Sequence, residues 1–221
     1  MARLGKRLQC IHDLVNDHSI IADIGCDHGL LCIALIESHT AIKAYACDVA
    51  NGPLDRAKEA IRSAGLQDRI TPMLADGIAQ VPPEADTIII AGMGFETIRK
   101  ILLEGRNRWG NGRTFILASH TDVEDLRRFL SDHHFVIDDE RIVLERHYYQ
   151  IIKAHHDEEA RSLTEDEILF GVYAKNEKLF LSYWQKEKKK CEEILRKMPS
   201  SHERYPSVKQ RYLRIESMMQ R

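Results

Sequence analysis

The chain has 221 residues, of which 43% are hydrophobic and 30% are charged. This composition suits a globular fold with one large domain, or with one domain of about 150 residues and a smaller module. No stretch approaches the roughly 18 apolar residues of a membrane helix, and charges interrupt the N-terminal segment where a signal peptide would be apolar. We therefore expect a cytoplasmic protein without a membrane partner.

The five cysteines and eleven histidines do not predict a disulfide framework or a metal site. The cysteines are odd in number and no two are spaced as CxxC, and the histidines form no HExxH pattern.

Charge is distributed unevenly along the chain. Residues 1–160 hold 18 basic and 25 acidic residues, a net charge of -7, whereas residues 161–221 hold 14 and 9, a net charge of +5. A basic tail on an acidic body hints at a polyanionic partner.

Over the first 155 residues, expected strands alternate with expected helices. The strands are apolar runs without a clean alternation, which is typical of a sheet covered by helices on both faces. This pattern predicts a Rossmann-like, doubly wound α/β sheet with an antiparallel last strand. After an amphipathic helix within 3–16, strands are expected at 20–25, 41–49, 70–74, 87–91 and 114–118, helices at 30–37, 54–63, 96–103 and 123–132, and a closing hairpin at 136–144 and 148–154.

The charged stretch that ends near residue 159 marks the expected domain boundary, which gives a first domain of residues 1–158 and a second of residues 159–221. In the second domain two apolar series step by three and four residues, separated by a Pro-Ser-Ser breaker, and predict a coiled-coil-like antiparallel helical hairpin. One charge, Lys188, falls in a core position of the hairpin, where its stem can pack while its head reaches water. The two series are Leu181, Trp184, Lys188, Cys191, Leu195 and Met198, and Val208, Tyr212, Ile215 and Met219.

Small and acidic residues follow the successive expected strands. The sequence DIGCDHG, residues 23–29, comes after the first strand, and Asp48 closes the second, where a carboxylate can bind the hydroxyls of a ribose. Because the carboxyl ends of parallel strands form one edge of a sheet, these positions predict a nucleoside-binding site. The candidate cofactor-binding residues are Asp23, Gly25, Cys26, Asp27, Gly29, Asp48, Val49, Asp76, Gly77 and Gly92.

The charges at this site distinguish between two nucleoside cofactors. A dinucleotide needs GxGxxG, with its pyrophosphate at the helix N-terminus, but the three glycine positions hold Gly25, Asp27 and Leu30. Asp27 would place a negative charge beside the pyrophosphate, whereas it would attract the cationic sulfonium and ammonium groups of S-adenosylmethionine. The methyl donor S-adenosylmethionine is therefore the favoured cofactor.

The segment IAGMG, residues 90–94, follows the fourth parallel strand, which faces the methyl acceptor in this architecture. The chain lacks the Asn/Asp-Pro-Pro-aromatic sequence with which many enzymes grip an exocyclic amine, so a different acceptor atom or binding mode is implied. Glycines at this position allow the backbone to approach a flat base closely. The plainer interpretation is a glycine turn before a helix.

Together these segments resemble the bacterial tRNA (adenine-N1)-methyltransferase family called TrmK. The similarity covers nearly the whole chain, and DxGxDH together with AGMG is fairly specific. It implies methylation of N1 of adenine 22 in the D-loop region of tRNA, with S-adenosylmethionine as donor. The matching segments are LGKRL at 4–8, DIGCDH at 23–28, Asp48-Val49 with Gly52-Pro53, IAGMG at 90–94 and Phe170-Gly171.

The sequence departs from the family pattern where the substrate would lie. The family's DHAYLP becomes Asp27-His28-Gly29-Leu30-Leu31-Cys32, which removes an aromatic residue and a proline, and GMGG ends in Phe95. A Gln-Pro dipeptide is replaced around Ser119-His120, and a Gly-Lys-x-Tyr-Glu stretch becomes residues 146–150, RHYYQ. These departures leave the exact target base open, whereas the cofactor positions are kept.

The expected reaction is attack of adenine N1 on the donor methyl group, with the base unpaired or flipped out of its stack. We expect Asp27, His28 and Met93 at the reacting groups, with Asp27 stabilising the cationic product and His28 orienting the base.

Two other functions remain open: a protein that binds cofactor and RNA without turnover, and a methyltransferase for a small molecule or protein whose basic hairpin serves dimerisation. The chain is expected to be a monomer or weak dimer and to contact tRNA phosphates through Arg7, Lys186, Lys188, Lys189, Lys190, Arg211 and Arg214.

Overall fold

The computed structural model describes residues 4–110, 112–172 and 177–220. The chain forms two compact units, residues 1–173 and residues 174–221. Each unit has its own arrangement of secondary structure, and the two are considered separately.

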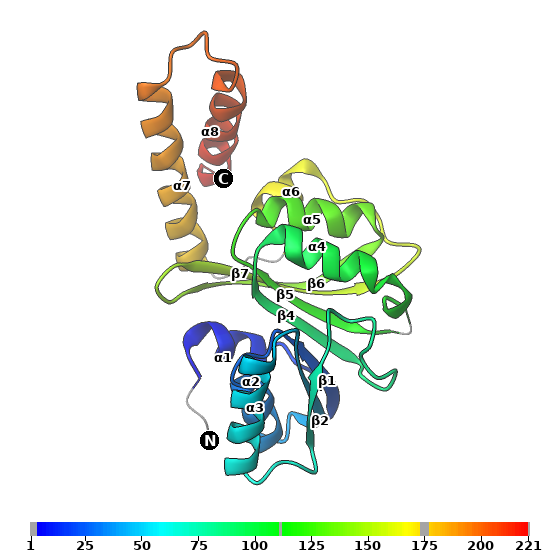
Figure 1. Cartoon of the computed structure of the whole chain (residues 1–221). Coiled ribbons are helices and arrows are strands. Elements are labelled where there is room, and N and C mark those ends of the chain that lie inside the picture. The colour runs from blue at the N-terminus through cyan, green and yellow to red at the C-terminus, as the bar shows by residue number, and fades with distance from the viewer. Residues whose placement is uncertain (1–3, 111, 173–176, 221) are drawn as a thin grey trace. The chain divides into compact units, whose positions relative to one another are not determined.

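The first unit is built on a seven-stranded sheet in the order β3-β2-β1-β4-β5-β7-β6 (Figure 1). Strands β1 to β5 run parallel to one another, and β7 runs antiparallel to both β5 and β6. This confirms the Rossmann-like sheet with an antiparallel last strand. The strand order reverses between β1 and β4, so a ligand is expected at their carboxyl ends. The strands are Ser19–Ile24 (β1), Ala41–Asp48 (β2), Ile70–Leu74 (β3), Thr87–Met93 (β4), Thr114–Ser119 (β5), Phe135–Leu144 (β6) and Tyr148–His156 (β7).

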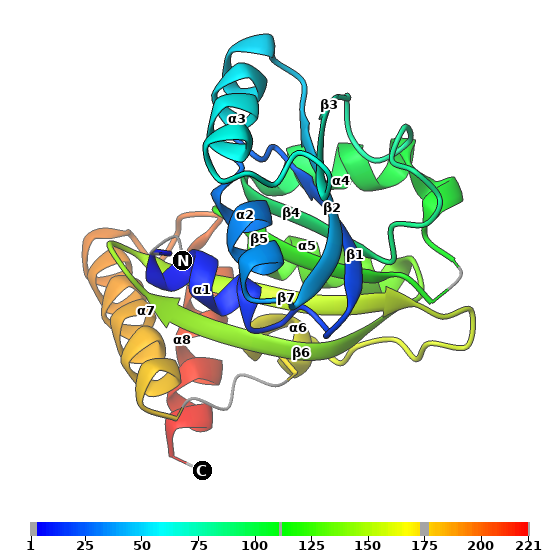
Figure 2. The same ribbon diagram turned by 90° about the horizontal axis from the view of Figure 1, so that it is seen from below.

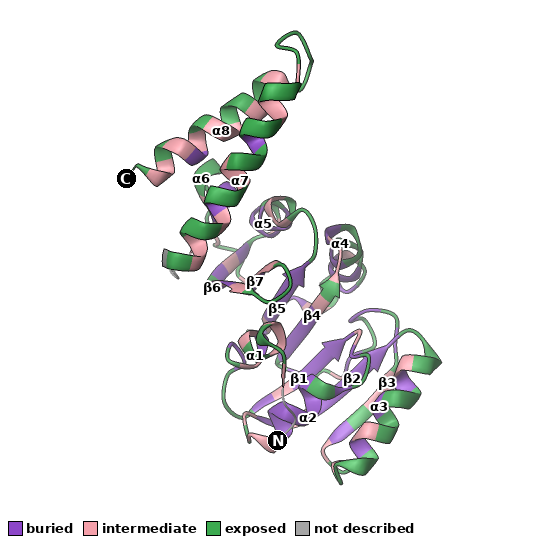
Figure 3. Ribbon diagram, turned by 90° about the vertical axis from the view of Figure 1, so that its left-hand side faces the viewer, coloured by how far each residue is buried: buried purple, intermediate pink, exposed green. Residues whose placement is uncertain are grey.

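Helices cover both faces of this sheet (Figures 1 and 2). One face packs under α1 to α3 and buries Ile11, Leu35 and Ile61, whereas the other packs under α4 and α5 and buries Ile98 and Leu126. The burial of both faces explains why the strands read as continuous apolar runs (Figure 3). The helices are Lys6–His12 (α1), Leu30–Glu37 (α2), Asn51–Ser63 (α3), Phe95–Glu104 (α4), Val123–Asp132 (α5) and Glu165–Phe170 (α6), with a 3₁₀ turn at Arg106–Arg108.

The short helix α6 was not expected from the sequence. Thr164 begins it with a capping box: its hydroxyl accepts a hydrogen bond from the Glu167 backbone N–H, and the Glu167 carboxylate accepts one from the Thr164 backbone N–H. The helix then buries Ile168, Leu169 and Phe170. The signal Thr-x-x-Glu before an apolar run was present in the sequence and is a known mark of a helix start.

A buried ion pair ties α6 into the first unit. Arg127 on α5 and Glu140 on β6 pair at 2.5 Å with almost no exposure, and the Arg127 guanidinium also donates to the Ile168 carbonyl at 2.9 Å. The other Glu140 oxygen accepts from the Val172 N–H at 3.0 Å. The segment after residue 158 therefore folds with the sheet, and the observed division at residues 173 and 174 lies later in the chain than the expected boundary at 158 and 159.

The second unit contains two helices, Glu177–Lys197 (α7) and Tyr205–Met219 (α8), which pack against each other as the expected hairpin. Trp184, Cys191 and Ile215 are buried in it, whereas Leu181, expected in the same apolar series, is exposed. Lys188 keeps its core position because its ammonium donates to Glu216 at 2.9 Å and lies 5.2 Å from the centre of the Tyr212 ring. Among the described residues no helix is long and apolar enough to cross a membrane.

Candidate active site at the carboxyl ends of β1 and β4

The turn after β1 is a backbone cradle. Gly25 has a φ of +78°, and the N–H groups of Gly25 and Cys26 both donate to the Cys47 carbonyl, at 2.9 and 3.0 Å. A Cβ on Gly25 would lie 2.5 Å from the Met93 methyl carbon, so a side chain there would both strain the turn and displace Met93. Gly29, with a φ of +66°, leads into α2, and a Cβ on it would lie 3.4 Å from the Ala57 Cβ. The structure thus brings Gly25, Met93 and Gly29 into one small region.

Asp27 and His28 lie at the exposed rim of this cradle. Asp27 has a φ of +48°, a left-handed conformation that aspartate tolerates better than most residues. Its side chain is 64% exposed, and its carboxylate lies 3.1 Å from the Arg56 guanidinium and 3.7 Å from the His28 imidazole. A carboxylate in this position is open to a ligand, but it already shares its charge with a surface arginine.

Asp23, by contrast, is buried at the end of β1. Burial is the main cause that raises the pKa of its carboxyl from 3.8 to about 7; the positive charge of Arg7 and the Cys32 thiol oppose this rise, and the nearby charge of Asp48 adds to it. The thiol lies 3.9 Å from a carboxylate oxygen of Asp23. A group with this pKa ionises readily when a cationic ligand arrives, because the ligand compensates the cost of a buried negative charge.

Asp48 ends β2 beside this position. Its Oδ1 accepts a hydrogen bond from the Ala50 N–H at 2.9 Å, which fixes the side chain at the start of α3. Val49 is exposed next to it, and Asp76 and Gly77 follow β3, the neighbouring strand. The predicted ribose-binding residue Asp48 and the predicted cofactor-binding residues Asp76 and Gly77 therefore lie at neighbouring strand ends.

The end of β4 faces a second group of side chains. Gly92 has a φ of +86°, and a Cβ on it would lie 3.4 Å from a guanidinium nitrogen of Arg7 and 3.7 Å from the His120 imidazole. The Arg7 guanidinium also lies 5.4 Å from the centre of the Tyr149 ring, which meets the His120 ring edge to face at 5.8 Å. These aromatic side chains come from the segments that depart from the family pattern, and the sequence did not single out Tyr149 as a site residue.

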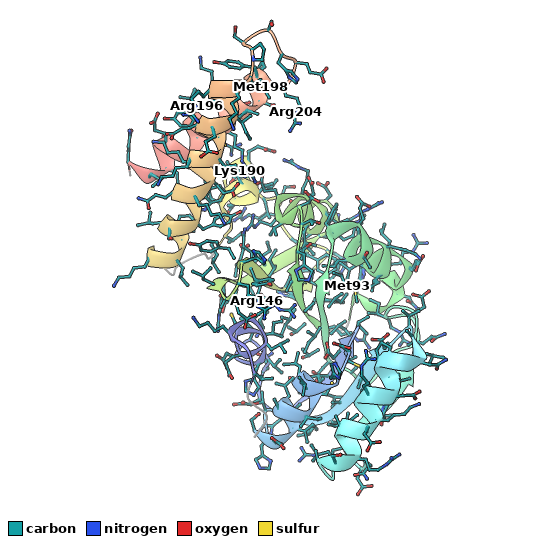
Figure 4. All side chains as sticks on the ribbon, turned by 60° about the vertical axis from the view of Figure 1, so that its left-hand side comes forward. Met93, Arg146, Lys190, Arg196, Met198 and Arg204 are labelled. Carbon is teal, nitrogen blue, oxygen red and sulfur yellow. The ribbon has the colours of Figure 1, made fainter. Side chains whose placement is uncertain are left out.

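A pocket of about 110 Å³ lies between the residues at the end of β1 and those at the end of β4. Its lining includes Arg7, Asp23, Gly25, Asp27 and Ala91. Figure 4 labels Met93, the last residue of β4, and Arg146, which lies in the loop between β6 and β7. Arg7 was expected on an RNA-facing surface, but the structure places it half-buried against this pocket.

The thiols around the pocket are not reactive groups. Burial raises the pKa of Cys47 to about 12 and raises the pKa values of Cys26 and Cys32 as well, so all three stay protonated. No cluster of ligands that could hold a metal ion occurs among the described residues. The site therefore offers a glycine cradle, several carboxylates and one guanidinium, which suits a cationic nucleoside such as S-adenosylmethionine better than a pyrophosphate.

The comparison with known proteins decides the family. The family model of TrmK, tRNA (adenine(22)-N(1))-methyltransferase, matches residues 21–219. The chain belongs to the TrmK family. Bacillus subtilis tRNA (adenine(22)-N(1))-methyltransferase is 30% identical over 194 residues, which cover 84% of this chain and 81% of that protein.

Two solved structures extend the likeness of this TrmK chain to almost its full length. M. capricolum TrmK, in complex with S-adenosyl-homocysteine, has a TM-score of 0.87 at 29% identity and covers 98% of both chains. A Streptococcus pneumoniae protein in complex with S-adenosyl-L-methionine has a TM-score of 0.87 at 30% identity, over 97% of this chain and 99% of that one. The predicted family and fold are thereby confirmed, including the helical tail.

The tail cations predicted to contact RNA fall into two groups in this TrmK chain. Lys186, Lys189 and Lys190 are exposed along α7, although Lys190 lies 3.8 Å from Glu187. The others are less accessible: Lys188 pairs with Glu216, Arg211 lies 3.9 Å from Glu187 and 5.8 Å from the Trp184 ring, and Arg214 is half-buried.

Two exposed cations near the loop of the hairpin, Arg196 and Arg204, were not named from the sequence (Figure 4). They flank the Pro-Ser-Ser breaker, and that position was the signal that could have identified them as accessible. Together with Lys186, Lys189 and Lys190 they are among the accessible candidates for phosphate contacts on this unit.

Proposed function

We propose that this chain transfers a methyl group from S-adenosylmethionine to N1 of adenine 22 of tRNA, in the cytoplasm and as a monomer or weak dimer. The observation that carries the proposal is the full-length match to the TrmK family together with a glycine cradle and carboxylates at the ends of β1, β2 and β3.

The cofactor end of the site fits the methyl donor. Asp48 is held by the Ala50 N–H in a position to accept hydrogen bonds from ribose hydroxyls. The Gly25 turn leaves no side chain between the backbone and a ligand, and Asp23 and Asp27 supply negative potential next to it. When bound, S-adenosylmethionine supplies an electrophilic methyl group on a positively charged sulfur.

The acceptor end must receive a base that is hidden when paired. Extrusion of a base costs a few kcal/mol, and the exposed Gly92 and His120 with the half-buried Tyr149 offer a backbone surface and aromatic rings to receive it. Adenine N1 then attacks the methyl carbon opposite the sulfur, and the base becomes cationic. Asp27 stabilises this charge or accepts the N6 proton, His28 orients the base, and Met93 helps define the space for the methyl group.

Positioning accounts for most of the expected rate enhancement, because the donor is already reactive. The basic hairpin contributes by holding tRNA phosphates, so its role is in substrate affinity rather than in the chemical step.

The test is mass spectrometry of nucleosides from unmodified tRNA incubated with the protein and S-adenosylmethionine. We expect one N1-methyladenosine per tRNA and none on a matched tRNA in which adenine 22 is replaced by guanine. Binding of both ligands without methyl transfer would show a protein without turnover, and the proposal would be wrong. Methylation of the guanine-22 tRNA at another adenine would keep the reaction but refute the position.

A further inference from the structure

The first unit ends in a short segment that buried charges hold in place. Helix α6 ends at Phe170, and Val172 is the last residue of the first unit that the structure describes. The Val172 N–H donates to Glu140 Oε2 at 3.0 Å, while Glu140 Oε1 accepts from the Arg127 Nε at 2.8 Å. Both charged side chains are buried. The end of this unit is therefore bonded to its interior.

Gly171 lies between these contacts and leaves no room for a side chain. Its φ is +89°, and a Cβ on it would lie 2.6 Å from Glu140 Oε2 and 3.3 Å from Arg127 Nη2. The carboxylate is fixed, because Arg127 and Val172 each bond one of its oxygens, and Arg127 is fixed in turn by a hydrogen bond to the Gln150 side chain. Only glycine accommodates both this backbone conformation and this close approach.

The bond to Val172 does more than complete the helix. The Ile168 carbonyl of α6 already accepts from Arg127 at 2.9 Å, which satisfies a group that the end of a helix leaves open. A buried ion pair adds little stability compared with apolar residues of the same volume, whereas its hydrogen bonds require one geometry. What the Glu140 contact determines is the point at which the chain leaves the first unit. Residues 173–176 separate this point from α7.

We propose that Gly171, held between Glu140 and Arg127, is a positioning residue for tRNA: it fixes the point from which the basic hairpin is tethered. This rests on the proposed function, in which the hairpin and the active site bind one tRNA molecule. Two linked sites on one ligand gain affinity from their effective concentration, which falls roughly as the 3/2 power of the linker length. Release of Gly171 and Val172 would lengthen the linker without touching the cofactor site.

The experiment is steady-state methylation of tRNA by the full chain and its Gly171→Ala variant. If release roughly doubles the length of the linker, KM for tRNA should rise about threefold. The kcat and the calorimetric affinity for S-adenosylmethionine should stay at the parent values, and amide hydrogen exchange at Val172 should become faster. Gly65→Ala is the matched control. Gly65 also has a positive φ, +68°, but no described atom lies within 4 Å of a Cβ on it, so its KM for tRNA should equal that of the parent.

A second variant keeps the test decisive if Gly171→Ala does not fold. Val172→Pro removes the N–H that Glu140 accepts, and the ψ of Gly171, 163°, is the extended conformation that a residue before proline adopts. The same rise in KM is expected.

Faster exchange with a parental KM, or exchange at Val172 that is unchanged in Gly171→Ala, would overturn the assignment. So would an equal rise in KM in Gly65→Ala, or a loss of cofactor affinity that accompanies the rise in the Gly171 and Val172 variants, since the anchor would then only stabilise the catalytic unit. A parent protein that does not methylate tRNA would refute the proposed function. An active parent whose KM these variants leave unchanged would refute this inference alone.

Discussion

The two units of this chain carry charge in opposite ways. Residues 1–173 hold 19 basic and 28 acidic residues, a net charge of -9, and residues 174–221 hold 13 and 6, a net charge of +7. The observed boundary therefore sharpens the asymmetry that the sequence showed at residue 160. The acidic first unit repels a polyanion such as tRNA, except where positive charges at its site offset this repulsion. The basic second unit attracts a polyanion.

The units also differ in how their polar side chains are placed. In the first unit Asp23, Gly25 and Asp48 lie at strand ends whose positions are fixed by a buried sheet. A small displacement of one of these residues would therefore disturb the whole site. In the second unit Lys186, Lys189 and Lys190 lie on the exposed surface of a helix. Substitutions in the first unit should thus have large, specific effects on cofactor binding, whereas single substitutions in the second should have small effects on tRNA binding.

Among single substitutions, the largest effect is expected at Asp48. Asp48→Ala should weaken S-adenosylmethionine binding by roughly 1–3 kcal/mol, or about 5- to 150-fold, because charge-assisted bonds to the ribose are removed. Asp48→Asn is the matched control, since its amide oxygen can still accept from the Ala50 N–H and keep the local backbone. Calorimetry of both variants measures the effect. Unchanged affinity in a folded Asp48→Ala protein would remove this residue from the cofactor site.

A smaller effect on the chemical step is expected at Asp27. Asp27→Asn should slow single-turnover methyl transfer roughly tenfold, below the effect of a fully buried electrostatic contact, because Asp27 is exposed and shares its charge with Arg56. The tRNA affinity should hardly change. Arg56→Gln serves as a control that frees the carboxylate without removing it. Equal single-turnover rates for Asp27→Asn and the parent protein would exclude electrostatic help from this carboxylate.

The pH dependence of cofactor affinity should follow Asp23. Because the pKa of this carboxyl is about 7, it is mostly neutral at pH 5.5 and mostly ionised at pH 7.5, and a cationic ligand prefers the ionised form. Affinity should rise roughly fivefold across this range, below the pH at which an α-amino group loses its proton. Titrations at several pH values should show the rise in the parent protein and a flat profile in Asp23→Asn. A rise of equal size in Asp23→Asn would assign the pH dependence to another group.

The same shift has the opposite sign for the stability of the unligated protein. Between pH 4 and 7 the folded state retains a proton on Asp23 that the unfolded chain, with a pKa near 3.8, has released. Stability from this group should therefore decrease as pH rises through that window and level off above it. The protein binds its ligand best where this residue stabilises the fold least.

The smallest effect is expected on the hairpin. Lys189→Gln should lower tRNA affinity only about two- to threefold and reduce the slope of log affinity against log salt by about one unit, as when one phosphate is no longer neutralised. Lys188→Gln is a useful comparison because Lys188 is already paired with Glu216. Its removal should lower the stability of the hairpin more than the salt slope. Identical slopes for Lys189→Gln and the parent would leave Lys189 without a role in RNA binding.

Much of the sheet was predictable because its strands are apolar runs that are buried on both faces of the sheet. The order of elements, the antiparallel last strand and the glycine and aspartate positions at strand ends all followed from local patterns. The capping box of α6 was also visible as Thr164 and Glu167, but a helix of only six residues gives too short an apolar period to predict. Its packing depends on Arg127 and Glu140, which are far away in the sequence.

The pocket itself could not be predicted in the same way. Arg7 lies in an amphipathic helix, Tyr149 at the start of a hairpin strand and His120 after β5, and no spacing in the sequence links them. They meet only because α1 packs against the β6–β7 hairpin. Single cations such as Arg7 therefore look like surface charges in the sequence, and only the structure shows that one of its guanidinium nitrogens is buried.

The division of labour between the two units is tested most directly by a chain that ends at residue 173, compared with the full chain. This end point keeps α6 and its hydrogen bonds to Arg127, which an earlier truncation near residue 160 would remove. We expect cofactor affinity to stay within about twofold, whereas tRNA affinity falls by roughly 100-fold or more and its salt dependence flattens by about one unit of slope for each phosphate that is no longer neutralised. Equal tRNA affinities and equal slopes for the two chains would contradict the account and leave the hairpin a packing or dimerisation element.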